Sequence, residues 1–164
     1  MKRILLVLAA IAAVFLAGRA IRRALASDET RIRWLVEDMA GGFDRTRMGP
    51  ILAGIARDWE DESSGADRDT LRQALAYLFF TAKDEATKRF PYRVEVEITR
   101  LEVRRADPGP RTADCGVHAR FLERHGEQEK LAWEIEITAR LERGEEGWRI
   151  RRTSHATKSG RMLR

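Results

Sequence analysis

The spacing of apolar residues changes at Pro91, and this change constrains the fold more than any other feature of the sequence. Before Pro91, apolar side chains recur every three or four residues, which is the period of an amphipathic helix. After Pro91 they alternate with polar residues, as in a strand with one buried face. A run of helices followed by a run of strands predicts an α+β fold.

Three amphipathic helices are predicted before Pro91. Ser27 is placed to cap the first of them, and Pro50 is suited to the first turn of the second because its ring presets a helical φ angle. The expected helices extend from Asp28 to about Asp44, from Pro50 to about Trp59, and from Asp67 or Asp69 to about Lys83.

Four strands joined by short turns are predicted after Pro91. In the first strand the apolar phase slips between Ile98 and Leu101, which indicates a β-bulge or a bend and therefore a curved sheet. Turn residues lie at 107–110, at Gly126 and at 144–147. Such short connections predict an antiparallel meander. We therefore expect three helices packed on one side of a curved, antiparallel four-stranded sheet.

The order of these elements over residues 28–158 resembles the cone-shaped nuclear transport factor 2-like fold, which ketosteroid isomerases and polyketide cyclases share. The resemblance rests on Phe43 in the first helix, on residues 53–59, on the third helix with Leu71, Leu75 and Phe79, and on the closing residues 147–150. It implies a pocket at the wide end of the cone, frequent dimerisation through the sheet, and a buried Trp148. The fold alone does not choose among activities.

Residues 1–27 are interpreted as a signal peptide or a signal anchor that precedes a neutral domain. Lys2 and Arg3 come before an apolar run over 4–17, and three arginines follow it. The leader holds five of the 31 basic side chains and no acidic one, so the 26 basic and 26 acidic groups of the remaining chain balance. The basic pI therefore does not predict a nucleic-acid-binding surface.

We expect an uncleaved anchor that enters a bacterial-type inner membrane through residues 4–18, with the domain in the periplasm. The alternative is secretion after cleavage at the small-x-small pattern of residues 24–26, just before Ser27. In either case residues 28–158 form the domain, and residues 159–164 form a basic C-terminal tail.

Metal and redox chemistry have no support in the sequence. Cys115 is the only cysteine, and the three histidines lie at 118, 125 and 155 without the spacing of zinc ligands. We expect neither a metal nor another cofactor. Cys115 is interpreted as a small buried strand residue.

Catalytic residues are sought as polar side chains on the apolar faces of the strands. An isomerase of the resembled kind needs a carboxylate base and a hydrogen-bond donor in an apolar site, but the inner phases of the second and third strands carry no acid. The remaining pocket candidates are Asp61, Tyr92 and Arg152. Asp61 stands between Glu60 and Glu62, so it is interpreted first as a solvated loop acid.

Inward and outward residues are expected to alternate without interruption along the whole of the last strand. Trp148, Ile150 and Arg152 then share its inner face, and His155 falls on the outer face. His118 falls on the outer face of its own strand. Both histidines are therefore interpreted as exposed, and no catalytic constellation is predicted.

The outer face of the sheet is a candidate interaction surface. Glu134 and Glu136 are expected to pair with Arg149 and Arg151 across neighbouring strands, which makes this face a solvated array of charges. No aromatic residue follows Trp148, so a platform for nucleic acid is not expected.

Two functions follow from these expectations. The first is a noncatalytic, membrane-anchored or exported accessory domain that binds a protein partner or a second copy of itself through the sheet. The alternative is a binder of a small apolar ligand, or an isomerase-like or cyclase-like enzyme, that uses the cone pocket. The sequence does not identify the ligand.

Overall fold

Three helices form where the sequence supplies caps and apolar stripes. The computed structural model describes residues 25–84, 87–105, 109, 111–126 and 128–160. Helix α2 (Asp28–Asp44) begins at Ser27, whose side chain accepts the backbone N–H of Thr30, and α4 (Arg68–Thr81) begins at Asp67, which accepts from Thr70. Helix α3 (Met48–Gly54) lies between them. The three predicted helices are confirmed, although α3 is shorter than expected.

The sheet has six strands, where four were expected. Strands β3 to β6 form the predicted antiparallel meander, and the additional β1 and β2 precede α4. Neighbouring strands follow the order β2-β1-β6-β5-β4-β3, with β1 parallel to β6. The strand bounds are Ile55–Asp61 for β1, Ala66–Asp67 for β2, Tyr92–Arg104 for β3, Thr112–His125 for β4, Gln128–Gly144 for β5 and Gly147–Gly160 for β6.

Strand β1 replaces the second half of the expected second helix. The backbone of Gly54 approaches α2 so closely that a Cβ there would overlap the sulfur of Met39, and the helix ends at this contact. The spacing of Ile55 and Trp59 fits a helix, but both are buried in a strand that pairs with the edge of β6. The strand is favoured because β6 offers hydrogen-bond partners that an isolated segment lacks.

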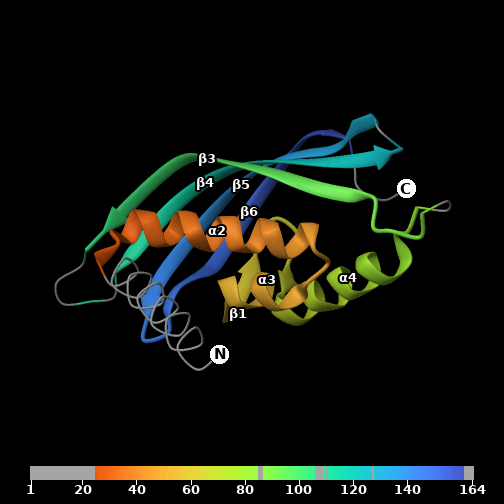
Figure 1. The fold of residues 1–164 in the computed structure, drawn as a ribbon. Helices are drawn as coiled ribbons and strands as arrows, with labels where there is room; N and C mark the ends of the chain where they lie inside the picture. Colours follow the sequence, from red (N-terminus) through yellow and green to blue (C-terminus); the bar gives the residue numbers. More distant parts are fainter. Residues whose placement is uncertain (1–24, 85–86, 106–108, 110, 127, 161–164) are drawn as a thin grey trace, which may run out of the picture.

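The sheet curves over the helices, which lie on one of its sides (Figure 1). The register of β3 against β4 shifts between Ile98 and Arg100, which confirms the predicted slip. Two further shifts in the pairing of β5 with β6 leave Arg151 and Lys158 without partners in the register. The result is an α+β cone whose concave face is turned toward the helices.

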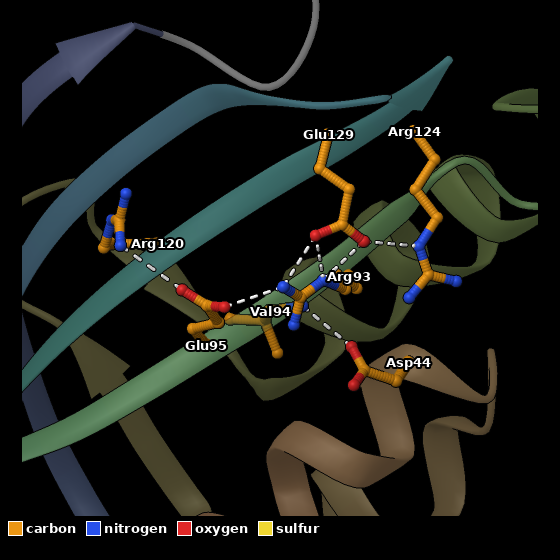
Figure 2. A network of polar contacts seen from close by, with 7 residues as sticks. All are labelled: Asp44, Arg93, Val94, Glu95, Arg120, Arg124 and Glu129. Carbon is orange, nitrogen blue, oxygen red and sulfur yellow. Dashed lines mark hydrogen bonds and ion pairs between the residues drawn. The ribbon is translucent and has the colours of Figure 1, made fainter. Parts of the chain in front are cut away.

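The core lies between the concave face and the helices. Trp148 and Cys115 are buried in it, as predicted. At the N-terminus of α2, Asp28 accepts hydrogen bonds from Arg111, Arg143 and Trp148. At the other end, Asp44 accepts the backbone N–H of Val94 at 2.8 Å, which attaches α2 to strand β3 at the edge of the sheet (Figure 2).

Candidate functional site

A cavity of about 660 Å³ lies between the helices and the concave face of the sheet. This volume is within the range of pockets that hold small organic molecules. Its walls come from all three helices and from strands β1, β3, β4, β5 and β6. The lining residues are Val36, Met39, Ala40, Phe43, Ile51, Ile55, Trp59, Leu71, Ala74, Leu75, Leu78, Val94, Val96, Cys115, Val117, Ala119, Phe121, Trp133, Ile137, Ala139, Leu141, Ile150, Thr153, Thr157 and Gly160.

Few polar groups face this cavity. The side chains of Thr153 and Thr157 contribute hydroxyl groups from β6. Trp59 of β1 lines the cavity and is only 7% exposed. Its indole Nε1 has no hydrogen-bond partner among the residues that the structure describes. A buried N–H donor without an acceptor is costly, and this nitrogen is enclosed by protein atoms rather than exposed to the cavity.

The concave face of β6 carries His155 between the two threonines, which the sequence did not indicate. The extra residue Arg151 reverses the phase of β6, so Arg152 turns to the outer face. The inner face beyond this point carries Thr153, His155 and Thr157. Their partners in β5 are Ala139, Ile137 and Ile135, in that order. The prediction that inward and outward residues alternate without interruption along this strand is therefore wrong beyond Ile150.

Asp61 lies beside His155. Asp61 is the last residue of β1 and is only 5% exposed. It is buried because β1 pairs with β6, which places the carboxylate on the inner side of the sheet. Its interpretation as a solvated loop acid is wrong. Its Oδ2 lies 3.2 Å from His155 Nδ1, and its Oδ1 accepts the hydroxyl of Thr153 at 2.9 Å. Ser64 donates to Oδ2 through its backbone N–H at 3.0 Å and through its hydroxyl at 2.6 Å.

These donors keep the carboxylate ionised. Burial by itself raises the pKa of Asp61, but the hydrogen bonds from Ser64, Thr153 and His155, together with the charge of His155, hold that pKa below its ordinary value. The pair of Asp61 and His155 is therefore an ionised carboxylate that orients an imidazole.

The other two pocket candidates lie elsewhere. Tyr92 begins β3, and its hydroxyl donates to Glu123 at 3.4 Å; burial and then the Glu123 charge raise the pKa of this phenol. Arg152 is exposed and pairs with Glu60 at 3.1 Å and Glu62 at 3.8 Å. Asp61, Tyr92 and Arg152 are not among the cavity-lining residues of the described chain.

Ion pairs cover the outer face of the sheet. Figure 2 shows one network, in which Arg93 contacts Glu95 and Glu129 at 2.7 Å, with Arg120 and Arg124 at its ends. The charged side chains on this part of the surface already have protein partners.

The four candidate interaction residues are paired differently from the prediction. The register of the hairpin places Arg149 opposite Glu142 and Glu134 opposite Ser159, so the expected pairing is wrong. Glu134 contacts His118 at 2.9 Å and Ser159 at 3.0 Å, and Glu136 contacts Lys158 at 3.0 Å. Arg149 pairs with Glu146, and Arg151 bridges Asp58 and Glu142.

The part of the chain that the structure describes offers neither a cluster of metal-binding side chains nor a membrane-spanning helix. Within it, no group of three or more histidine, cysteine, aspartate or glutamate side chains is placed to hold a metal ion. None of the helices in that part has the length and apolar composition to cross a membrane. The segment 4–18 and the tail 161–164 lie outside it.

Comparisons with known proteins define the fold class. No family model and no curated protein matches the sequence. Among solved structures, a nuclear transport factor 2-like protein with a cystatin-like fold from Novosphingobium aromaticivorans matches with a TM-score of 0.60 and 16% identity, over 89% of this chain and 92% of that one. A cystatin-like domain of unknown function from Nostoc punctiforme matches with a TM-score of 0.64 and 17% identity, over 80% and 78% of the two chains.

A third similar structure is described as a putative aromatic ring hydroxylase, also from N. aromaticivorans. It has a TM-score of 0.56 and 15% identity, over 78% of this chain and 87% of that one. The chain has the nuclear transport factor 2-like fold, as the sequence predicted. At these identities the likeness shows the fold alone, so the function has to be argued from the cavity.

Proposed function

We propose that this domain binds a small, uncharged and largely apolar molecule inside the cone. The observation that carries the proposal is the cavity of about 660 Å³, whose lining is almost entirely aliphatic and aromatic. Apolar surface of this extent gains free energy when a ligand displaces its water.

The stacked rings of Phe121 and Trp133 further define the ligand. Their centroids are 5.2 Å apart, and both rings line the cavity. A planar ring system packs well against such a pair. No charged side chain is among the described lining residues, which disfavours an ionic ligand because its charge would be desolvated without a partner.

Filling the cavity should prevent binding. Ala74 and its neighbour Gln73 are both exposed on α4, but only Ala74 also lines the cavity. We expect Ala74→Trp in the full chain to reduce photolabelling by benzophenone, an uncharged aromatic ketone, by at least about tenfold, which corresponds to about 1.4 kcal/mol. Labelling would be quantified, and the labelled residues mapped, by peptide mass spectrometry.

Gln73→Trp is the matched control, because it adds the same side chain one residue away. It should label as the wild type does, with adducts on the lining residues of β4, β5 and β6. Equal labelling of wild type and Ala74→Trp, or adducts confined to the outer face, would contradict binding in the cone.

We further propose, on the leader sequence, that residues 1–27 hold the domain at a bacterial-type inner membrane on its periplasmic side. Protease added to intact spheroplasts should then remove the domain, whereas a cytoplasmic marker should survive. Protection of the domain until the cells are lysed would reverse the orientation, and recovery of the domain in the medium would indicate cleavage and secretion.

Association through the sheet, with a protein partner or a second copy, stays a prediction. The paired charges of the outer face give it less support than the cavity gives to ligand binding. A noncatalytic role stays a prediction as well.

A further inference from the structure

We propose that the exposed side of helix α4 docks on the surface of a membrane that contains anionic lipids. The side chains that form this docking surface, called here the α4 face, are those of Gln73, Ala76, Tyr77 and Phe80. Basic residues follow them at the C-terminal end of the helix. The proposal goes beyond ligand binding in the cone, because it gives the same domain a second surface and a partner of its own.

The α4 face has no charged side chain. Residues 73–82 are all uncharged, although six of the ten are exposed, whereas the solvent side of a surface helix is ordinarily charged or polar. Leu75 and Leu78 are buried against the core, but Tyr77 is 63% exposed and Phe80 is 77% exposed. These two rings are three residues apart, so they lie next to each other across one helical turn. Neighbouring exposed aromatic side chains indicate a contact surface.

Three basic side chains stand at the C-terminal end of the α4 face. The Nζ atom of Lys83 lies over the ring of Phe80, 5.2 Å from its centroid, and Lys88 and Arg89 are exposed in the loop that follows. None of the three forms an ion pair within the described part of the chain. Exposed aromatic rings next to unpaired cations are typical of helices that lie at an anionic membrane surface.

The acidic groups that the structure describes near this face already have partners. Asp69 contacts Arg72 at 3.5 Å, and the carboxylate of Asp84 accepts the backbone N–H of Thr87 at 2.7 Å and its hydroxyl at 2.8 Å. A second copy of the chain, packed α4 against α4, would therefore add three more cations without freeing an acid to pair with them. Lipid phosphates supply the missing negative charge, and the region beneath them accepts aromatic rings.

The cavity reaches the protein surface beside the α4 face. Ala74 lines the cavity and is also exposed, and it lies one turn before Tyr77. An uncharged and largely apolar molecule dissolves in a bilayer, so docking through α4 places the cavity next to a phase that holds such ligands. This support rests on the proposed function, whereas the aromatic and basic side chains support membrane docking without it.

Fluorescence quenching tests the contact in the full chain. Ala76→Cys, combined with Cys115→Ala so that one thiol remains, carries a nitrobenzoxadiazole label on the α4 face. Arg140→Cys in the same background is the matched control, because it carries the label on the exposed outer face of β5. Both proteins are mixed with vesicles of phosphatidylcholine and phosphatidylglycerol that contain a lipid with a nitroxide on its acyl chain next to the headgroup.

We expect the label at residue 76 to lose about half of its emission, and the label at residue 140 less than about a tenth, because only the α4 face enters the headgroup region. Omitting phosphatidylglycerol, or adding high salt, should reduce the quenching at residue 76 at least about twofold. The leader is present in every variant, so it does not account for a difference between the two labels.

Removing the aromatic rings should remove the contact. Tyr77→Ser together with Phe80→Ser should lower the quenching at residue 76 to the level seen at residue 140. Leu131→Ser is the matched control, because Leu131 is also an exposed apolar side chain but belongs to β5. Its quenching should equal that of the protein labelled at residue 76 without further changes.

Four outcomes would overturn the proposal. They are equal quenching of the two labels, unchanged quenching after Tyr77→Ser and Phe80→Ser, and quenching that is the same without phosphatidylglycerol. The fourth is a blue shift of the label at residue 76 that grows with protein concentration without quenching by the nitroxide, because a second copy would then cover the α4 face. Benzophenone labelling detects occupancy of the cavity and nitroxide quenching detects contact with lipid, so the failure of one proposal is distinguishable from the failure of the other.

Discussion

Replacing Asp28 with alanine is expected to lower the free energy of unfolding by about 3 kcal/mol. Asp28 is 8% exposed and accepts from Arg143 at 2.8 Å, Arg111 at 2.9 Å and Trp148 at 3.1 Å. The substitution leaves the buried indole N–H of Trp148 without its acceptor and removes the ion pairs that join the start of α2 to Arg111, just before β4, and to Arg143 of β5. Urea denaturation followed by circular dichroism measures the loss.

The expected loss lies at the lower end for a buried ion pair, because both arginines are partly exposed and can regain water. Asp38→Ala is the matched control on an exposed turn of the same helix, and it should change stability by less than about 0.5 kcal/mol. Equal losses in the two variants would show that Asp28 does not clamp the helix to the sheet.

The contribution of Asp28 should also depend on pH. Burial alone raises the pKa of Asp28, but the hydrogen bonds from Trp148 and Arg111 and the charges of Arg143 and Arg111 hold that pKa below its ordinary value of 3.8. A carboxyl with a lowered folded-state pKa stabilises the protein above the unfolded-state pKa, and this stability is lost as the pH falls through the folded-state pKa. The difference between wild type and Asp28→Ala should therefore be constant near neutral pH and shrink below about pH 4.

Replacing Phe43 with alanine is expected to cost about 3 kcal/mol of unfolding free energy. Phe43 is 7% exposed, and its ring makes edge contacts with the rings of Phe79, Phe90 and Phe121, with centroids 5.3 to 5.7 Å apart. The truncation removes apolar burial and three aromatic contacts, and it opens space where α2, α4 and β4 meet. The same denaturation experiment measures this loss.

Phe80→Ala is the control for the loss of a phenyl ring. Phe80 follows Phe79 in α4, but its side chain is 77% exposed. Its truncation should therefore cost less than about 0.5 kcal/mol of unfolding free energy. If Phe43→Ala were as stable as Phe80→Ala, the contacts of the Phe43 ring with Phe79, Phe90 and Phe121 would not stabilise the fold.

Local signals predicted much of the fold. Ser27 and Asp67 cap helices because their side chains satisfy backbone N–H groups within three residues, a relation that is visible in the sequence. The slip between Ile98 and Leu101 predicted the irregular pairing of β3, and the residues around Trp148 predicted a strand with a buried indole. Each of these features depends on neighbours in the chain.

The candidate site was missed because it depends on residues that are distant in sequence. Asp61 appeared as one acid among three, and only the pairing of β1 with β6 buries it beside a histidine 94 residues further along. A spacing of two between Thr153, His155 and Thr157 could have suggested a shared strand face. It could not have shown which face, because that depended on an extra residue at Arg151.

The sequence by itself determined the class of the fold, the order of its three helices and of strands β3 to β6, the helix caps and the curvature of β3, because periodicity and capping act over a few residues. Only the tertiary structure decided that residues 55–61 form a strand, that the sheet has six strands, and that His155 faces inward toward Asp61. The physical reason is that strand pairing joins hydrogen-bonding groups from distant segments, and one unpaired residue in a strand exchanges its two faces.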